Sequence, residues 1–169
     1  MKKLMSESYA VKMANVLPPD SNSHGTLFGG RLLQYVDDVA AISARRHCRE
    51  AVVTASIDSM DFLRPIHVGE IVMLEAMVTH TGRSSMEVMV KISKEDLTRE
   101  SGKELAAFSF LTFVALDENN NTVEVPKIEP DTERLQWLND TGKERSERRL
   151  ERKERSKSLS NFFASDLLE

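Results

Sequence analysis

The chain has 169 residues, 40% of them apolar and 30% charged, with a formal net charge of −4 at pH 7. This length and apolar content fit one domain with a single core, and the negative charge argues against a nucleic-acid-binding domain, which is normally basic. The start MKKLMSESYAV has no apolar run behind its two lysines, and no segment approaches the length of a membrane span. Because the one cysteine, Cys48, cannot form an internal disulfide, we expect a reduced, cytoplasmic setting.

The predicted elements begin with a short strand over residues 9–17, ended by Pro18 and Pro19. From Phe28 to about Arg46, apolar residues recur at helical spacing and predict a helix of about five turns. Further strands are predicted within residues 51–66, 69–82, 84–93 and 105–116. The last of them is apolar on both faces, which is typical of a strand inside a sheet.

One long helix, with strands joined by short turns, predicts an α+β fold in which an antiparallel sheet wraps around a single helix. We expect this domain to cover residues 1–126, followed by a charged, helical extension over residues 127–169. Because one helix covers only one face of such a sheet, we also expect self-association. The run DENNN after the last strand resembles a calcium loop but lacks its glycine and its final acid, so we expect a solvated turn.

The loop SNSHGTLFGG, residues 21–30, leads into the predicted helix. Gly29 and Gly30 stand where the helix begins, so their backbone N–H groups are free to bind a ligand, and the helix dipole adds positive potential there. Such groups can stabilise the negative charge that develops on a carbonyl oxygen. Asn22 could hydrogen-bond the same carbonyl or orient a water molecule. The alternative for Asn22 is an ordinary loop residue that forms an Asx turn.

Asp37 and Asp38 are adjacent acids on the predicted helix, and they fall on different faces. Asp38 shares its face with polar residues and belongs in water or in surface ion pairs. Asp37 lies in line with small and apolar residues, a face that a ligand or another backbone can approach closely. This position suits a general base or a nucleophile. The alternative is an acid that caps a loop or pairs with an arginine at a subunit contact.

A carboxylate, an amide side chain and free helix N–H groups together predict acyl transfer to water, without a metal or an organic cofactor. The segments NSHGTLFGGRLLQYVDDVAAISA, VVTASIDSMDFLRPIHVGE and RSSMEV resemble the hotdog-fold acyl-CoA thioesterases, the acyl-CoA hydrolase group with brain-type enzymes and small bacterial relatives. The resemblance covers nearly all of residues 8–125. It implies hydrolysis of fatty acyl-CoA to a free acid and coenzyme A (CoA), in a dimer that often assembles further into a hexamer.

The resemblance also implies roles for individual residues. Asp37 corresponds to the catalytic acid, Asn22 to an asparagine contributed across the dimer interface, and Gly30 or its neighbours to the oxyanion hole. Contacts with CoA fall on a strand and on a turn, at Thr54, Ala55, Ser56, Arg83, Ser84 and Ser85. Because Thr54 and Ser56 alternate with apolar residues, both hydroxyls are expected on one face of the strand. An arginine of the extension that takes part in some relatives corresponds to Arg145.

Three alternatives remain open. His24 could contribute to chemistry, since hotdog dehydratases and hydratases pair a histidine with an acid. The domain could also bind acyl-CoA or a nucleotide without turnover. The stretch KERSERRLERKERSK has eight basic and four acidic residues, typical of an exposed helix laced with ion pairs. It could instead contact the phosphates of CoA, RNA or an acidic partner.

Overall fold

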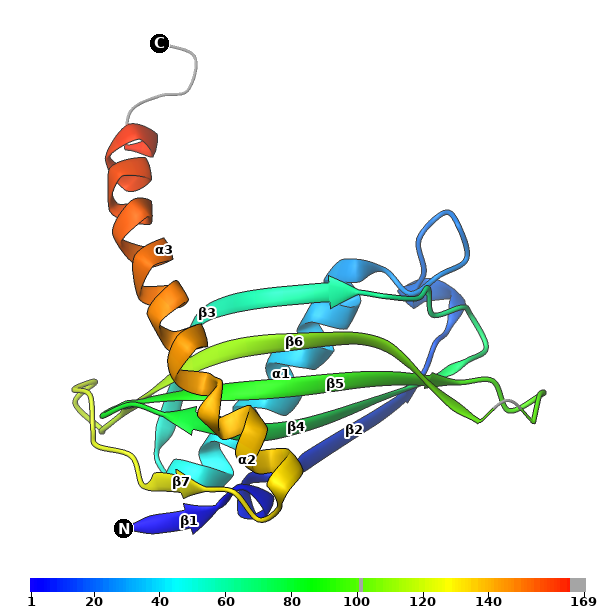
Figure 1. The fold of residues 1–169 in the computed structure, drawn as a ribbon. Coiled ribbons are helices and arrows are strands. Elements are labelled where there is room, and N and C mark those ends of the chain that lie inside the picture. Colours follow the sequence, from blue (N-terminus) through cyan, green and yellow to red (C-terminus); the bar gives the residue numbers. More distant parts are fainter. Residues whose placement is uncertain (101, 165–169) are drawn as a thin grey trace.

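The computed structural model describes residues 1–100 and 102–164. Its helices and strands, in chain order, are β1 (Lys2–Leu4), the 3-10 helix η1 (Met5–Ser8), β2 (Ala10–Asn15), the 3-10 helix η2 (Pro18–Asp20), α1 (Gly29–Cys48), β3 (Ala51–Phe62), β4 (Ile71–Thr81), β5 (Ser85–Glu95), β6 (Lys103–Leu116), β7 (Lys127–Glu129), α2 (Glu133–Asp140) and α3 (Gly142–Phe163) (Figure 1).

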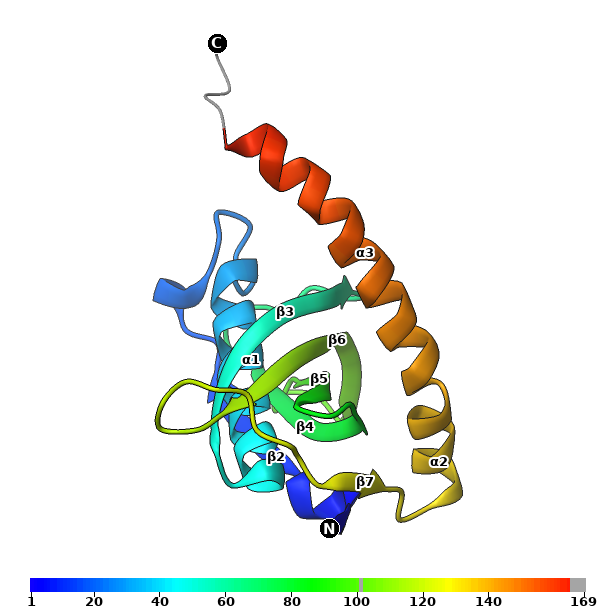
Figure 2. The ribbon, with the colours of Figure 1, turned by 90° about the vertical axis from the view of Figure 1, so that its left-hand side faces the viewer.

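The main sheet has five strands in the order β2-β4-β5-β6-β3, and every neighbouring pair is antiparallel. It curls around α1, as Figure 2 shows in a view along the strands. The predicted α+β fold is therefore confirmed, and β6 lies inside the sheet as its apolar faces indicate. The strands β2 and β3 form the two edges.

The core lies between α1 and the concave face of the sheet. Val36, Val39 and Ala40 are fully buried on α1, because their spacing places them on one side of the helix. They pack with the inward-facing residues of β4, β5 and β6, of which Leu111 and Phe113 are among the largest fully buried side chains. This helix face fixes the rotation of α1, and with it the direction of every polar side chain that α1 carries.

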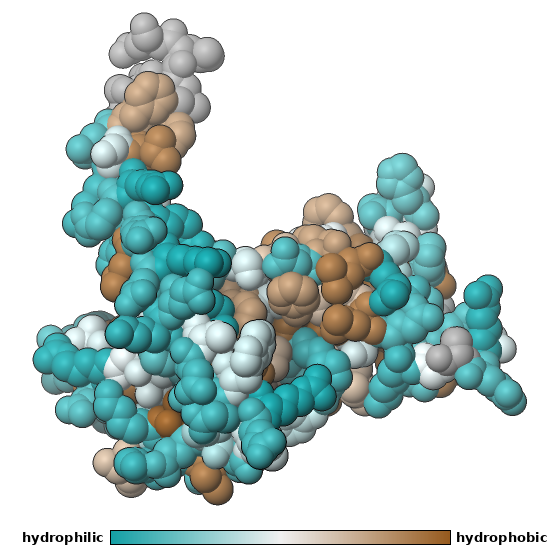
Figure 3. Space-filling view, in the orientation of Figure 1, coloured by the Kyte–Doolittle hydropathy of each residue, from teal (hydrophilic) through white to brown (hydrophobic). Residues whose placement is uncertain are grey.

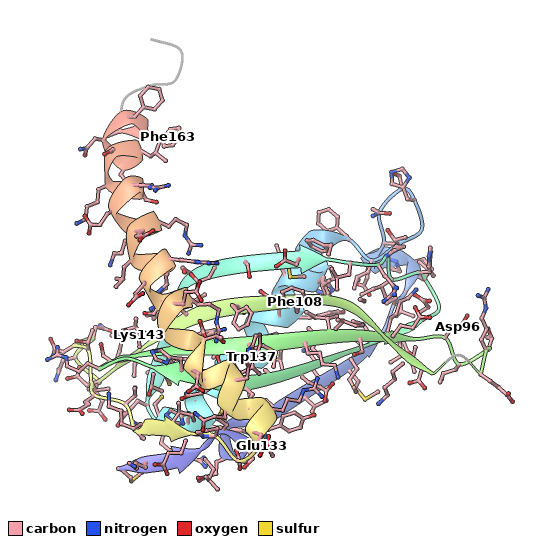
Figure 4. The ribbon with its side chains drawn as sticks, in the orientation of Figure 1. Asp96, Phe108, Glu133, Trp137, Lys143 and Phe163 are labelled. Atoms are coloured by element: carbon pink, nitrogen blue, oxygen red, sulfur yellow. The ribbon has the colours of Figure 1, made fainter. Side chains whose placement is uncertain are left out.

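The extension is connected to the domain at several points. The strand β7 pairs in parallel with β1, so the predicted boundary at residue 126 falls just before a strand that adds to the body of the fold. The helices α2 and α3 lie across the convex face of the sheet, and the far end of α3, which carries Phe163, projects away from it (Figure 1 and Figure 4). At their junction, Gly142 approaches β4 so closely that a Cβ there would lie 2.6 Å from the His80 Cβ.

Candidate active site

The two adjacent acids of α1 point to different neighbours. Asp38 accepts a 2.6 Å bond from Lys12 of β2, and its side chain is 53% exposed. Asp37 is half-buried and accepts a 2.8 Å hydrogen bond from the Thr54 hydroxyl of β3. The prediction that the helix separates these acids is confirmed, because only Asp37 faces the α1 and β3 edge of the domain.

The edge at which Asp37 lies is open to a second chain. The strand β3 pairs on one side only, with β6, so no other strand of the described residues pairs with its second side. Apolar side chains surround it: Val53 and Ile57 of β3 are 47% and 43% exposed, and Ile42 of α1 is also exposed. Figure 3 shows apolar side chains gathered over the end of β3 and the start of α1. This is the kind of surface that a partner subunit covers.

Asn22 organises the loop before α1. Its side-chain oxygen accepts from the backbone N–H of His24 at 2.9 Å and of Thr26 at 3.3 Å, and its amide nitrogen donates to the Thr26 hydroxyl at 2.9 Å. Gly25 allows the tight turn with a positive φ of 71°. Within one chain, Asn22 therefore forms the Asx-type turn of the ordinary alternative, which also holds the loop in a fixed shape.

The start of α1 offers the free donors that the glycines predict. Arg31 and Leu32 donate their backbone N–H groups to the Phe28 carbonyl, whereas those of Gly29 and Gly30 find no acceptor in residues 1–100 and 102–164. Gly29 lines a pocket of about 330 Å³ together with Asn22. Gly30 does not line that pocket. It lies beside the Phe28 ring, where an added Cβ would come within 2.6 Å of a ring carbon.

Helix geometry separates these donors from the acid of the same chain. At a rise of about 1.5 Å per residue, Gly30 lies roughly 10 Å along the axis from Asp37, and Asn22 precedes the helix altogether. Hydrogen bonds of about 3 Å cannot connect both groups to one carbonyl over that distance. A site that uses Asp37 with Asn22 or Gly30 therefore requires two chains.

A bulge in β3 overturns the expectation that the Thr54 and Ser56 hydroxyls share a face. Thr54 pairs with Phe113 and Ser56 with Thr112, so Ala55 is an extra residue in the ladder. Because of this insertion, Thr54 points to α1, where it contacts Asp37. Ser56 points to the convex face, where its hydroxyl accepts from Arg152 of α3 at 3.2 Å.

Several of the residues implied for CoA meet in a second pocket, on the convex face. This pocket measures about 380 Å³ and includes Ala55, Ser56 and Ser85. Arg83 is exposed in the β4–β5 turn, and neither it nor Ser84 is among the lining residues. Their contact with CoA stays a prediction.

The other wall of this pocket is α3, whose residues sequence reasoning missed. Arg149, Arg152 and Lys153 line it. Their i, i+3, i+4 spacing could have been recognised in the sequence, because it predicts that all three side chains lie on one helix face. As a whole, the charge run predicts either a solvated helix or one that contacts the phosphates of CoA, RNA or an acidic partner, and only Arg145 is singled out by number.

Arg145 lies elsewhere, in a contact that anchors α3. Its guanidinium bonds the buried carboxylate of Glu87 at 2.8–3.1 Å, the Leu138 carbonyl at 2.7 Å and the Thr141 hydroxyl at 2.7 Å, and it stacks over the Phe110 ring at 4.5 Å. These contacts hold the first turn of α3 on β5. A role for Arg145 in binding CoA stays a prediction.

The remaining candidate residues, His24, His47 and Cys48, differ in their burial. His24 is exposed at the tip of its loop. His47 is buried, and burial lowers its pKa although a 2.8 Å bond to the Pro126 carbonyl opposes that change. Burial likewise raises the pKa of the Cys48 thiol. In the part of the chain that the structure describes, no group of three or more acidic, histidine or cysteine side chains could hold a metal ion, and no helix could span a membrane.

Comparison with known proteins agrees with this architecture. Residues 24–101 match the model of the Thioesterase superfamily. YkhA of Bacillus subtilis, described as an uncharacterized acyl-CoA thioester hydrolase, is 51% identical over 164 residues, which are 97% of this chain and 95% of that protein. An acyl-CoA hydrolase from Staphylococcus aureus, solved with butyryl-CoA, CoA and CoA disulfide, has a TM-score of 0.92 and 44% identity, and the match covers 98% of this chain and 100% of that one. A hexameric acyl-CoA thioesterase has a TM-score of 0.87 and 44% identity, over 90% of this chain and 97% of that one.

Three variants of the S. aureus enzyme have also been solved, in which an asparagine, an aspartate or a threonine is replaced by alanine. In that chain the aspartate follows the asparagine by 15 residues, and the threonine follows the aspartate by 17. Asn22, Asp37 and Thr54 have the same separations. By its sequence and its fold, this chain belongs to the Thioesterase superfamily and, within it, to the acyl-CoA thioester hydrolases.

Proposed function

We propose that the protein hydrolyses fatty acyl-CoA thioesters to a free acid and CoA, with the Asp37 carboxylate as the general base or the nucleophile. The observation that carries the proposal is the 2.8 Å hydrogen bond from Thr54 to Asp37 at the open edge of the domain. It fixes one carboxylate of α1 on the side where a second chain can bring a thioester. The matching separations of the three substituted residues in the S. aureus enzyme support the same assignment.

The reacting centre lies between two subunits in this proposal. One chain supplies Asp37 and Thr54, and the partner supplies Asn22 with the free N–H groups of Gly29 and Gly30. Two helices that run antiparallel across a two-fold interface bring the start of one helix beside the middle of the other. The protein is therefore at least a homodimer, and the hexameric relatives make a trimer of dimers the expected assembly.

In the reaction, the thioester carbonyl accepts hydrogen bonds from the partner's helix amides, which stabilise the oxyanion that forms there. Asp37 either removes a proton from the attacking water, so that the CoA thiolate leaves and the free acid forms, or attacks the carbonyl carbon directly, so that the thiolate leaves and water then hydrolyses the mixed anhydride to the free acid and Asp37. A single turnover in ¹⁸O-labelled water distinguishes the two routes. Label in the Asp37 carboxylate establishes direct attack, and label in the product acid alone favours water activation. No cofactor is needed for either route.

The outward side of α3 argues against RNA or an acidic partner as the main ligand. There, Arg148 pairs with Glu144 at 2.5 Å and Lys157 with Glu154 at 2.7 Å, as the alternating charges predict. Such pairs reduce the charge of the exposed face, whereas Arg149, Arg152 and Lys153 line the pocket that α3 forms with the sheet. A buried, unpaired Cys48 suits the cytoplasmic setting that we propose.

The test is thiol release from short, medium and long acyl-CoA esters by the intact protein and by two matched variants. Asp37→Asn should lower kcat by about 10²–10⁴-fold, the usual contribution of a positioned acid or base. Asp38→Asn removes the same charge one residue away, and its kcat should stay within about twofold of the intact protein, because a surface pair contributes little. Full activity of a folded Asp37→Asn protein would exclude the mechanism. If no ester is hydrolysed but CoA binds, the protein is a non-catalytic acyl-CoA sensor.

A further inference from the structure

The pocket that contains Asn22 and Gly29, here called the Asn22 pocket, is lined by two kinds of side chain. Its polar pair is Asn22 and Thr26, which are hydrogen-bonded to each other at 2.9 Å. Its floor consists of buried apolar side chains, namely those of Leu27, Leu32, Ile66 and Ala107. Its rim is formed by Phe62 and Leu63, at the end of β3. The groups proposed to bind the thioester carbonyl therefore share one pocket with a hydrophobic surface.

Phe62 connects these two parts of the pocket. A Cβ added to Gly29 would lie 3.7 Å from the tip of the Phe62 ring, which is an ordinary contact distance. Phe62 also pairs with Ala107 across β3 and β6, so both side chains lie on the same face of the sheet. Phe62 is 58% exposed and belongs to the apolar surface over the end of β3 and the start of α1 in Figure 3. An apolar ligand in the pocket would remove part of this ring from water, which favours its binding.

Backbone hydrogen bonds fix the width of the pocket. The N–H of Leu27 donates to the Ile66 carbonyl at 2.7 Å, which joins the loop before α1 to the loop after β3. Leu63 and Arg64 both donate to the Ala106 carbonyl of β6, at 2.9 and 3.0 Å. Because the walls are held on both sides, the pocket can discriminate between ligands that differ by a few methylene groups.

The single charge of the pocket is already engaged. Among the described residues that line the pocket, Arg64 is the only one with a charged side chain. Its guanidinium donates to the Leu105 carbonyl at 2.9 Å and lies 3.8 Å from the Glu104 carboxylate. Glu104 thus serves as its counter-charge, and an acyl group that ends in a carboxylate gains little from Arg64. The walls match an unsubstituted hydrocarbon chain.

The volume of the pocket limits the length of such a chain. An apolar cavity of about 150 Å³ holds the six carbons of benzene, so the Asn22 pocket, with about 330 Å³, has room for roughly twelve carbons. We propose that the acyl chain of the substrate occupies the Asn22 pocket, and that Phe62 and Ala107 select medium-chain acyl-CoA esters. The proposal rests on the proposed function, because it takes the thioester carbonyl to lie at Asn22 and Gly29.

The test is the chain-length dependence of kcat/KM, measured with straight-chain esters from acetyl-CoA to palmitoyl-CoA below the concentrations at which they form micelles. Each added methylene should raise kcat/KM by up to about fourfold until the pocket is full, because each one is removed from water. Beyond lauroyl-CoA the values should stay level or fall. A maximum at acetyl-CoA or butyryl-CoA would overturn the proposal, and so would a rise that continues to palmitoyl-CoA.

Two variants should change this dependence in different ways. Phe62→Ala removes the wall beside Gly29, and the ratio of kcat/KM for decanoyl-CoA to that for acetyl-CoA should fall by roughly tenfold. Ala107→Val adds two methyl groups to the floor, so the maximum should move to an ester shorter by about two carbons. Phe163→Ala removes a ring of similar exposure at the far end of α3 and should leave the series unchanged.

Each result is a comparison of esters on one protein sample, so a loss of folded protein does not alter it. An unchanged ratio in Phe62→Ala would overturn the proposal. If that variant changes the oligomeric state instead of the ratio, the ring belongs to a subunit contact and the assignment to the acyl chain is wrong.

Binding of S-alkyl-CoA thioethers, which cannot be hydrolysed, separates this proposal from the catalytic one. In calorimetry, S-decyl-CoA should bind roughly tenfold or more tightly than S-ethyl-CoA, and Phe62→Ala should reduce that difference. If the intact protein hydrolyses no ester but shows this preference, the catalytic proposal fails and the pocket remains assigned. If it hydrolyses acyl-CoA but binds both thioethers equally, the catalytic proposal holds and the assignment of the pocket is overturned.

Discussion

The Thr54 hydroxyl of β3 reaches across to α1 and donates to Asp37, so that one hydrogen bond connects the edge strand with the helix. This hydrogen bond occupies one oxygen of the Asp37 carboxylate and thereby fixes the direction of the other oxygen. The contact depends on the bulge at Ala55, without which Thr54 and Ser56 would share a face.

Loss of this bond should reduce catalysis without unfolding the protein. Thr54→Val keeps the shape of the side chain and removes the donor, and we expect kcat to fall by about tenfold, since a hydrogen bond to a charged group contributes about 1.5–3 kcal/mol. Thr54→Ser retains the hydroxyl and should recover most of that loss. Steady-state kinetics with one acyl-CoA measure both variants, and a Thr54→Val enzyme with unchanged kcat would show that Asp37 does not need its partner.

A site shared between subunits predicts complementation. Asp37→Asn and Asn22→Ala should each be inactive as homodimers, but a mixed dimer carries one site with both native residues. Random pairing in a co-expressed sample should then restore about a quarter of the native activity, because half of the dimers are mixed and half of their sites are intact. Two different affinity tags allow purification of the mixed dimer. No recovery in that species would place Asn22 and Asp37 in the same chain or outside the site.

The elements that follow from periodicity could be predicted from the sequence, and the bulge could not. The spacing of Val36, Val39 and Ala40 fixes the buried side of α1, and this alone separates Asp37 from Asp38. An extra residue such as Ala55 leaves the pattern of a strand intact, so nothing local reveals that the faces exchange there.

Long-range contacts could not be predicted from the sequence either. The pairing of β1 with β7 joins residues more than 120 positions apart, and three-residue strands carry almost no pattern. The inward face of α3 was visible as spacing, but a charged helix is usually solvated. Only the carboxylates of Glu87 and Asp58 on the sheet make inward arginines favourable, and their position depends on the register of β3 and β5.

Glu87 and Arg145 should stabilise the protein far more than the surface pairs of the same helix. The Glu87 side chain is 2% exposed, so Glu87→Gln leaves a mostly buried guanidinium without its counter-charge, a change that costs about 3–5 kcal/mol in fully buried pairs and somewhat less here. Glu144→Gln breaks an exposed pair with Arg148 and should cost less than about 0.5 kcal/mol. Urea unfolding curves of the two variants measure the difference. Equal stabilities would mean that α3 is not anchored through Glu87.

Acidification should weaken the fold through the buried His47 and the half-buried His80. Burial is the main reason that the pKa values of His47 and His80 lie below the ordinary 6.5 in the folded chain. The unfolded chain then binds more protons than the folded one below about pH 6.5, so this contribution to stability is complete above that pH and is lost as the pH falls further. For His47, the bond to Pro126 and the nearby charges of Lys3 and Glu7 modify the shift without reversing it.

The measurement is the free energy of unfolding in urea at pH 7.5 and pH 5.5. The intact protein should lose stability between these values, and His47→Gln should lose less of it, although its stability at pH 7.5 is already lower. His24→Gln, a change at an exposed loop tip, should reproduce the pH dependence of the intact protein. If His47→Gln and His24→Gln show the same dependence as the intact protein, the loss at low pH comes from groups other than His47, because a neutral side chain at that position has no proton to gain.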